Sequence, residues 1–420
     1  MKVAIAGAGV GGLSLALMLA RRGIACEIFE ATAEIKPLGV GINLLPHAMK
    51  ELTELGLEPA IAAIAIETSS LAYFNQLGQP IWHEPRGLAA GYSWPQYSIH
   101  RGELQMLLLR AVEHEIGRER IHIGHALESF AQDSNHVTLT LRCRSDGAAI
   151  SESADVLVGA DGLHSALRRL LHPIGDELRF SGRMLWRATT VGKPFLDGRS
   201  MFMAGHQDQK FVCYPISEPR RKSGESLINW IAELRVGNDM PESDWNRRVD
   251  KSIFATKFSD WKWDWIDIPA LIDATDAIYE FPLVDRDPLP RWSVGRVTLL
   301  GDAAHPMYPI GSNGSAQAIL DARYLADCLR DIANVELALK EYEAERLPRT
   351  AGIVLRNRMN GPEQVMQIAH ERAPNGFSDI EQVIPFAERD AISLRYKRLA
   401  GFDPQALKAA AKLHAEKVTT

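Results

Sequence analysis

The glycine-rich segment at the start of the chain is the feature that most constrains the fold. Residues 2–6 form a short apolar run typical of a buried strand, and Gly7, Gly9 and Gly12 follow it with the spacing Gly-x-Gly-x-x-Gly. The first glycine permits a tight turn, the second lets the backbone approach phosphate groups, and the third lets the next helix pack closely on the strand. The segment therefore predicts a strand, a turn and a helix whose N-terminus faces the pyrophosphate of a dinucleotide.

A second strand pattern supports this prediction. Residues 25–29 are largely apolar and lead to Glu30, eighteen residues after Gly12. A carboxylate at this place can accept hydrogen bonds from the ribose of an adenosine. The glycine motif alone is a weak signal, and the acidic residue at the expected distance strengthens it.

The uncharged run of residues 3–20 has a competing interpretation as a signal peptide or membrane anchor. Four glycines within six positions would destabilise a spanning helix, each by about 1 kcal/mol relative to alanine. No cleavage site of small residues precedes the next strand pattern. We therefore expect a cytoplasmic protein without a membrane segment.

Composition agrees with a soluble enzyme of more than one packed unit. The chain has 420 residues, of which 46% are hydrophobic and 24% charged, and its net charge is -6. Without a basic tract, this mild acidity gives no electrostatic basis for binding nucleic acid. The four cysteines are scattered without a Cys-x-x-Cys pair, so we expect reduced core residues and no metal site.

Two further strand ends carry polar motifs. Residues 156–158 lead into Gly-Ala-Asp161-Gly, after which Ser165 is a candidate N-cap for a helix that bears Arg168. Much later, residues 296–300 lead into Gly301-Asp302-Ala-Ala-His305, and a loop at residues 309–314 precedes a helix predicted over residues 315–330. These segments indicate that the first domain is interrupted and resumed.

The last of these segments suits the far end of a dinucleotide. Asp302 could hydrogen-bond ribityl hydroxyls, and the helix that begins near Gly314 would direct its positive end at the loop. In a flavin, that end would stabilise negative charge on the pyrimidine edge of the ring. Together with the N-terminal motif, the segment predicts a bound flavin stretched across one domain.

We predict an α/β fold in which a Rossmann-like FAD-binding domain is interleaved with an antiparallel-sheet substrate domain, with a helical segment at the C-terminus. Short apolar and aromatic runs in the middle of the chain give the second domain its strand pattern. The predicted boundaries are residues 1–70, 98–178 and 291–350 for the FAD-binding domain, 71–97 and 179–290 for the substrate domain, and 351–420 for the C-terminal segment.

The three ordered motifs resemble the signatures of the single-component FAD-dependent aromatic hydroxylases, the family of p-hydroxybenzoate and salicylate hydroxylases. The resemblance covers roughly residues 1–350. Residues 37–43, 97–106 and 284–290 are also similar to the phenazine-modifying branch, typified by 5-methylphenazine-1-carboxylate 1-monooxygenase. The resemblance implies FAD as bound cofactor, NADH or NADPH as transient co-substrate, and a substrate pocket beneath the sheet of the second domain.

The resemblance also implies which residues contact FAD. They are Gly7, Gly9, Gly12, Glu30, Gly41, Arg101, Asp161, Asp302, Gly311, Asn313 and Gly314. The backbone at Pro309 and Gly311 would face the reacting ring. Many relatives have Gly-x-Gly-x-Asn after the prolines, whereas this chain has Gly311-Ser312-Asn313-Gly314, so the role of the loop is better supported than that of any one side chain.

The implied chemistry sets requirements for the pocket. Reduced FAD and O2 form a C4a-hydroperoxide that attacks an electron-rich ring, and water must be excluded from it by apolar walls. Candidate lining residues are Trp186, Met201, Met203, Tyr214, Trp230 and Met307. Any one of them could instead be ordinary core, which is the more common role of such residues.

Three polar residues keep open alternatives. Tyr214 could donate a hydrogen bond to the substrate or to a neighbouring carbonyl group. Arg187 could pair with an anionic substrate, although an exposed arginine is more common, and His305 is better interpreted as a structural neighbour of the flavin loop than as a base. The sequence identifies no catalytic acid or base.

The resulting hypothesis is an FAD-dependent monooxygenase that hydroxylates a phenolic or N-heteroaromatic substrate, with a phenazine-like carboxylate among the candidates. Its partners would be the small aromatic substrate and O2, and the C-terminal segment could mediate a homodimer. One alternative is an FAD-dependent oxidase or reductase that inserts no oxygen. Another is a non-catalytic nucleotide-binding module, which would purify without flavin colour.

Overall fold

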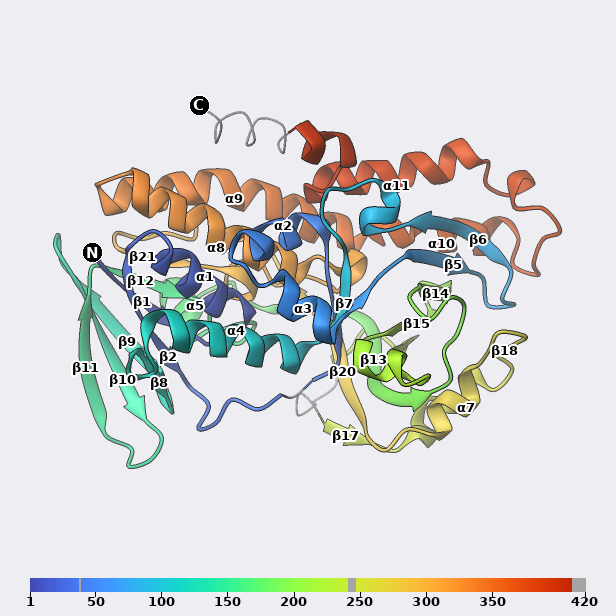
Figure 1. Cartoon of the computed structure of the whole chain (residues 1–420), viewed down its shortest axis with the longest axis horizontal. Helices are drawn as coiled ribbons and strands as arrows, with labels where there is room; N and C mark the ends of the chain where they lie inside the picture. Colours follow the sequence, from blue (N-terminus) through green and yellow to red (C-terminus); the bar gives the residue numbers. More distant parts are fainter. Residues whose placement is uncertain (38, 241–246, 410–420) are drawn as a thin grey trace.

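A five-stranded parallel sheet forms the centre of the first half of the molecule. The computed structural model describes residues 1–37, 39–240 and 247–409 (Figure 1). The strands follow the order β21-β12-β1-β2-β8 and all neighbours are parallel. Their bounds are β1 (Lys2–Ala6), β2 (Ala25–Glu30), β8 (Ile121–Ile123), β12 (Val156–Gly159) and β21 (Val297–Leu299). The strands predicted before the three motifs and before Glu30 are therefore present, and they lie side by side in this sheet.

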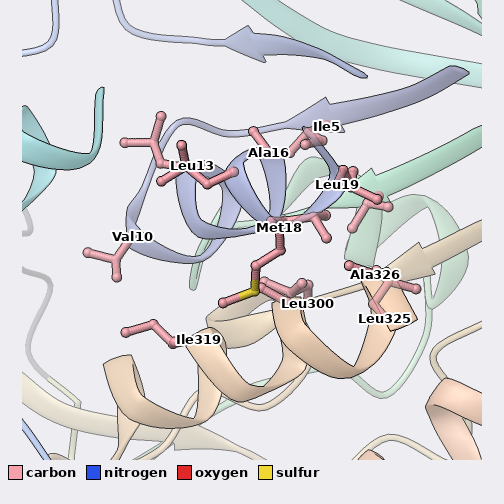
Figure 2. Close-up of a cluster of buried hydrophobic side chains, with 14 of the residues drawn as sticks. Ile5, Val10, Leu13, Ala16, Met18, Leu19, Leu300, Ile319, Leu325 and Ala326 are labelled. Carbon is pink, nitrogen blue, oxygen red and sulfur yellow. The ribbon is translucent and has the colours of Figure 1, made fainter. Parts of the chain in front are cut away.

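The uncharged N-terminal run, residues 3–20, comprises strand β1, the glycine turn and a buried helix. Helix α1 (Val10–Ala20) packs between β1 and α8 (Gly314–Asp331), where Met18 meets Leu300 and Ile319 (Figure 2). A helix that is apolar on all sides must be covered on all sides. The remaining cover of this layer comes from α4 (Arg101–Ile116) and α9 (Val335–Arg358).

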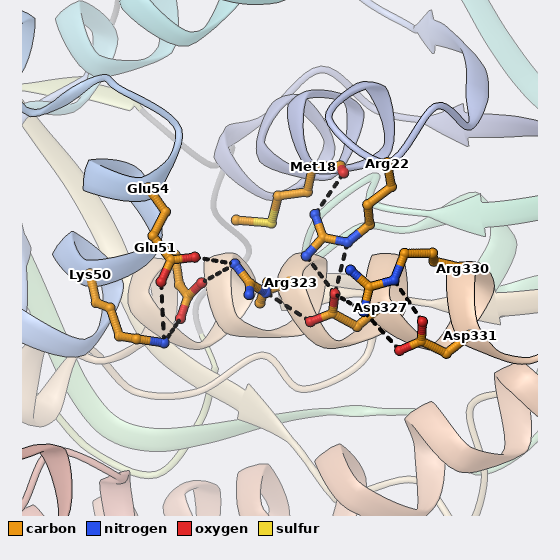
Figure 3. Close-up of polar contacts among 9 residues, drawn as sticks. All are labelled: Met18, Arg22, Lys50, Glu51, Glu54, Arg323, Asp327, Arg330 and Asp331. Atoms are coloured by element: carbon orange, nitrogen blue, oxygen red, sulfur yellow. Dashed lines mark hydrogen bonds and ion pairs between the residues drawn. The ribbon is translucent and has the colours of Figure 1, made fainter. Parts of the chain in front are cut away.

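Charged side chains connect α8 to its neighbours (Figure 3). Arg323 lies 3.1 Å from Glu51 on α2 (Pro46–Glu54) and 2.8 Å from Asp327 on its own helix. Asp327 also lies 2.6 Å from Arg22, just after α1. Such partly exposed pairs contribute about 0–1 kcal/mol each, so the buried apolar contacts provide most of the stability here.

An eight-stranded sheet forms the second half of the molecule. Its order is β17-β20-β13-β16-β15-β14-β5-β6. The strands are β5 (Ser70–Phe74), β6 (Pro80–Pro85), β13 (Leu178–Gly192), β14 (Met201–His206), β15 (Gln209–Pro215), β16 (Ser226–Arg235), β17 (Arg247–Val249) and β20 (Ile278–Arg286). All neighbours are antiparallel except β5 and β14, which run parallel because the chain enters the sheet twice. The predicted sheet is thus mixed at one pair.

Both faces of this sheet are covered. One face packs on Phe254, Phe258 and Trp261 and on α7 (Ile268–Asp273). The other faces the parallel-sheet half and the C-terminal helices α10 (Gln364–Arg372) and α11 (Phe386–Ala400). Successive side chains of a strand point to opposite faces, so each strand contributes to two separate apolar clusters.

Smaller elements complete the fold. Two three-stranded antiparallel sheets have the orders β3-β7-β4 and β11-β10-β9. Their strands are β3 (Gly41–Leu44), β4 (Ile66–Glu67), β7 (Tyr97–His100), β9 (His125–Gln132), β10 (Val137–Cys143) and β11 (Ala149–Ala154), and the short elements are α3 (Glu58–Ile64), α5 (Ala166–Leu171), α6 (Glu218–Lys222), β18 (Lys262–Trp263) and β19 (Ile266–Asp267). The end of the predicted C-terminal segment, residues 410–420, lies outside the described residues.

Within the described parts of the chain, no helix is both long enough and apolar enough to cross a membrane.

Candidate functional site

A cavity of about 1110 Å³ runs from the carboxyl ends of the parallel strands to the eight-stranded sheet. Gly7, Glu30, Asp161 and Asp302, which follow or end four of those strands, line its first part. Ligands of open parallel sheets bind at this edge because loops from neighbouring strands meet there. The structure thus brings the three sequence motifs to one cavity.

The glycine turn leaves backbone exposed to this cavity. Gly7 has φ +108°, and a Cβ there would lie 2.7 Å from the carbonyl carbon of Ala160. A Cβ at Gly12 would overlap the carbonyl oxygen of Gly7, so Gly12 serves the packing of α1 and does not line the cavity. Gly9 lines the cavity, and a Cβ there would meet no described atom within 4 Å. A phosphate could therefore approach the backbone at Gly9.

Glu30 is held at the end of β2 by backbone amides. Its Oε2 accepts a hydrogen bond from the amide of Ala8 at 2.8 Å, and its Oε1 accepts one from Thr32 at 2.8 Å. Each carboxylate oxygen can accept more than one bond, so capacity for ribose hydroxyls remains. Arg101 lines the same part of the cavity, and Gln105, which the sequence analysis missed, fixes the turn by donating to the carbonyl of Ala8 at 2.8 Å.

The second motif places Asp161 in the cavity and caps the start of helix α5. Asp161 lines the cavity, and its Oδ2 accepts hydrogen bonds from the amides of Ala166 and Leu167, while its buried Oδ1 has no hydrogen-bond partner within the described part of the chain. Burial raises the pKa of Asp161. Ser165 caps α5 as predicted, accepting from the amide of Arg168 at 2.8 Å.

Arg168 points away from the cavity. It is 1% exposed, pairs with Asp176 at 2.8 Å and donates to the carbonyls of Ala303 and Ala304 at 3.0 and 2.8 Å. These bonds hold the segment after Asp302 in place. The residue is therefore a support for the loop and does not reach the cavity.

The loop between β21 and α8 has an unusual backbone. Gly311 has φ +70° and Ser312 has φ +57°, a region that non-glycine residues rarely adopt. Pro309, Ser312, Asn313 and Gly314 line the cavity, whereas Gly311 faces Tyr396 on α11. Helix α8 begins at Gly314, so its positive end points at the cavity.

The predicted pocket residues divide between two faces of the eight-stranded sheet. Met203, Tyr214 and Met307 line the cavity, and Met201 lines only a small separate cavity behind the loop. The prediction that Trp186 and Trp230 line the pocket is wrong, because both side chains point to the face of the sheet that is opposite the cavity. Leu185 and Arg187 flank Trp186 and face the cavity, and Ile231 does so beside Trp230.

The two tryptophans belong to the outer apolar cluster. Trp186 stacks on Phe254 with ring centres 4.9 Å apart, and its Nε1 donates to Glu280 at 3.0 Å. Trp230 donates to Thr190 at 2.9 Å. The apolar wall that the sequence analysis missed consists of Leu185, Val212, Ile231, Tyr279 and Phe281.

Tyr214 connects the eight-stranded sheet to β3 of the three-stranded sheet β3-β7-β4. Its hydroxyl donates to the carbonyl of Gly41 at 2.8 Å, and Asn229 Oδ1 accepts from the amide of Gly41 at 2.7 Å. A Cβ at Gly41 would lie 2.7 Å from the Tyr214 ring. Of the two roles open for Tyr214, the bond to a neighbouring carbonyl is the one present.

Arg187 is a cation in the cavity wall without an acidic partner among the described residues. Its Nε has no hydrogen-bond partner in the ranges that the structure describes, its Nη2 lies 3.5 Å from the carbonyl of Gly41, and its Cζ lies 5.9 Å from the centre of the Phe281 ring. Burial lowers the pKa of Arg187, and the charge of Arg101 lowers it further. A partly buried guanidinium without a counter-ion is costly, so this position suits an anionic group of a ligand.

A second charged group in the wall is internally balanced. Lys210 lies 2.9 Å from Glu233 and 2.6 Å from Glu363, and Arg183 lies 3.0 Å from Glu233. All four are at most 5% exposed. Two cations and two anions leave no net charge here, in contrast to Arg187.

These features fit FAD and define a flavin-binding protein of the Rossmann type. The carboxylate of Glu30, the open approach to Gly9 and the positive end of α8 all border one continuous cavity, and they suit the adenosine ribose, the pyrophosphate and the isoalloxazine of FAD, respectively.

Comparison with known proteins agrees. A family described as FAD binding domain matches residues 1–357, and the chain belongs to this family of FAD-dependent aromatic hydroxylases. It is 46% identical over 361 residues to phenazine 1,6-dicarboxylic acid hydroxylase PhzS of Lysobacter antibioticus, covering 85% of this chain and 89% of that protein. It is 31% identical to 6-hydroxynicotinate 3-monooxygenase of Pseudomonas fluorescens, covering 84% and 89%.

A solved structure is similar along nearly the whole length. The crystal structure of HpxO from Klebsiella pneumoniae, complexed with FAD and uric acid, has a TM-score of 0.72 to this chain at 25% identity, covering 97% of this chain and 96% of that one.

Proposed function

We propose that this chain is a monooxygenase that uses FAD, NADH or NADPH, and O2 to hydroxylate an aromatic acid. The observation that carries the proposal is the continuity of the cavity, which joins the glycine turn and Glu30 to an apolar chamber beneath the eight-stranded sheet. Bound FAD would supply the activation of oxygen. The protein would supply position, dryness and charge.

The residues of the chain have distinct tasks in this proposal. Gly9 and Glu30 would hold the adenosine diphosphate half, and Asp302 would bind the ribityl region. The N-terminus of α8 at Gly314 would stabilise negative charge at the pyrimidine edge. Leu185, Ile231, Phe281 and their neighbours in the apolar wall would exclude water from the reacting ring.

The proposed substrate is a phenolic or N-heteroaromatic acid, and a phenazine-like carboxylate is the favoured candidate. The relatives named for phenazine 1,6-dicarboxylic acid and 6-hydroxynicotinate support this class. Arg187 supports the acid, because its guanidinium faces the cavity without a carboxylate partner in the described part of the chain. Planar guanidinium groups bind carboxylates through paired hydrogen bonds.

The test is a screen of aromatic acids for accelerated NADH and NADPH oxidation, with hydroxylated product and peroxide measured together. Product that accounts for the consumed O2 supports the proposal. Acceleration that yields only peroxide for every acid would favour an oxidase without oxygen insertion. A purified protein without flavin absorbance would favour a nucleotide-binding module.

The role of Arg187 is tested separately with R187Q. We expect KM for an accepted carboxylate, such as phenazine-1-carboxylate, to rise at least tenfold, and KM for the matching carboxamide to stay within twofold. An equal change for both compounds would assign Arg187 to the cofactor and leave the monooxygenase proposal intact.

We place the reaction in the cytoplasm, where NADH and NADPH are produced. The free thiols Cys26, Cys143, Cys213 and Cys328 suit a reducing compartment.

A further inference from the structure

Tyr396, on the C-terminal helix α11, contacts the loop between β21 and α8. Its hydroxyl lies 3.1 Å from the carbonyl oxygen of Ile310 and 3.0 Å from Oδ1 of Asn357, the two acceptors for its one proton. It also accepts a hydrogen bond from Nδ2 of Asn313 at 3.0 Å. Two of these three partners belong to the loop, so one hydroxyl group bonds the loop at Asn313 and, when its proton is directed at Ile310, at a second point.

The ring of Tyr396 fits only because glycines face it. A Cβ at Gly311 would lie 2.5 Å from ring carbon Cε1, and a Cβ at Gly361 would lie 3.0 Å from Cε2. Tyr396 is 1% exposed, and burial raises its pKa well above the usual value, so the hydroxyl keeps its proton. The ring of Tyr396 is therefore closely packed against Gly311 and Gly361, and its hydroxyl group remains a hydrogen-bond donor.

The opposite side of the loop has its own tether. Ser312 Oγ accepts a hydrogen bond from Nδ2 of Asn43 on β3 at 3.2 Å, and Asn43 Oδ1 accepts one from Ser98 at 2.6 Å. Because Ser312 has φ +57°, a conformation that non-glycine residues rarely adopt, it requires support from the surrounding structure. The loop is thus held between β3 on one side and α11 on the other.

Helix α11 is also fixed to the helix that follows the loop. Nε2 of Gln317 on α8 donates to the carbonyl of Ala400 at the end of α11, at 3.0 Å. A shift of α11 would therefore move Tyr396 relative to both ends of the loop.

We propose that Tyr396 is a positioning residue for the flavin, which makes α11 a working part of the FAD site although Tyr396 does not line the main cavity. Pro309, Ser312 and Asn313, which the hydroxyl and its neighbours hold, do line it. The match to the FAD-binding family ends at residue 357, so this support comes from beyond the matched region. The inference requires bound FAD and is independent of the substrate.

The test compares Y396F with Y92F. Tyr92 is a matched control, because its buried hydroxyl donates to the carbonyl of Phe402 at 2.6 Å and, among the described residues, makes no hydrogen bond to the loop. Each variant loses one hydroxyl group, so we expect similar small losses of thermal stability. Only Y396F should weaken FAD binding to the apo-protein, by about tenfold if one to two loop bonds of about 1 kcal/mol are lost, and shift the absorption bands of bound FAD.

Hydrogen exchange of the apo-protein provides a readout that needs no flavin. We expect faster exchange of the amides of residues 310–313 in Y396F and unchanged exchange there in Y92F. N313A, which leaves Tyr396 in place and removes one of its bonds to the loop, is a second variant with the same expected exchange. Unchanged loop exchange, FAD affinity and spectrum in Y396F, or equal changes in Y92F, would overturn the proposal.

Discussion

The carboxylate of Asp321 on α8 lies 2.5 Å from Nε2 of His305, sixteen residues earlier in the chain. The same carboxylate accepts from the amide of Gly301 at 3.1 Å and from Nε of Arg346 on α9 at 2.7 Å. Asp321 and His305 are at most 3% exposed, and neither lines the cavity. His305 therefore anchors the Gly301 segment to α8, in agreement with its interpretation as a structural neighbour of the flavin loop.

Replacing Asp321 should destabilise the fold strongly. D321N leaves the buried guanidinium of Arg346 without its counter-ion, which typically costs about 3–5 kcal/mol. Urea unfolding measures the loss. D327N is the control, because Asp327 makes partly exposed pairs, and its loss should stay near 1 kcal/mol or below. Equal losses in the two variants would contradict the assignment.

The same carboxylate should make stability depend on pH in the acid range. Burial raises the pKa of Asp321, but the charges of His305 and Arg346 outweigh burial and lower it to about 2. A depressed pKa stabilises the fold above the unfolded value near 4, and this stabilisation of about 2 kcal/mol disappears as the pH falls from 4 toward 2. Urea unfolding at several pH values should show a steeper acid loss in the wild type than in D321N, whereas parallel curves would refute the shift.

The two glycines of the first turn should fail differently when changed to alanine. G9A adds a methyl group where no described atom lies within 4 Å, so the apo-protein should keep its stability while FAD affinity falls at least tenfold. G12A forces a methyl group onto the carbonyl of Gly7, so it should lower the unfolding free energy by several kcal/mol. Thermal unfolding of the apo-proteins and FAD titration separate the two effects. Full FAD affinity in G9A would count against phosphate at this backbone.

Asn229 should be important for the connection between the eight-stranded sheet and Gly41 on β3. N229A leaves the buried amide of Gly41 without an acceptor, at a cost of about 1–3 kcal/mol. Y214F removes only the donor to the carbonyl of Gly41, which also lies near Arg187, so about 1 kcal/mol is expected. Urea unfolding of both variants checks this order, and a larger loss for Y214F would reverse it.

The two faces of strand β13 and its neighbours should separate stability from substrate binding. W186F alters the outer cluster, so it should lower Tm while leaving KM for the aromatic substrate unchanged. F281A removes an aromatic ring from the cavity wall, which enlarges the cavity, and it should raise KM for the aromatic substrate several-fold. Steady-state kinetics on both variants checks the assignment, and a raised KM in W186F would return Trp186 to the pocket.

The residues themselves determined the nucleotide half of the site. Short-range patterns carry that information, since the strand before Gly7, the acidic residue at the end of β2 and the cap at Ser165 depend on neighbours within a few turns of chain. The helix expected over residues 315–330 spans Gly314–Asp331 for the same reason. That the three motifs meet at one edge of the sheet follows from strands that run parallel.

Only the tertiary structure decided which side of the eight-stranded sheet faces the substrate. Alternation fixes that Leu185 and Arg187 share a face and that Trp186 lies on the other, but both faces are buried and apolar, so the pattern gives no direction. The contact of Tyr396 with Ile310 joins positions 86 residues apart. Such contacts arise from the packing of whole layers, and no local periodicity encodes them.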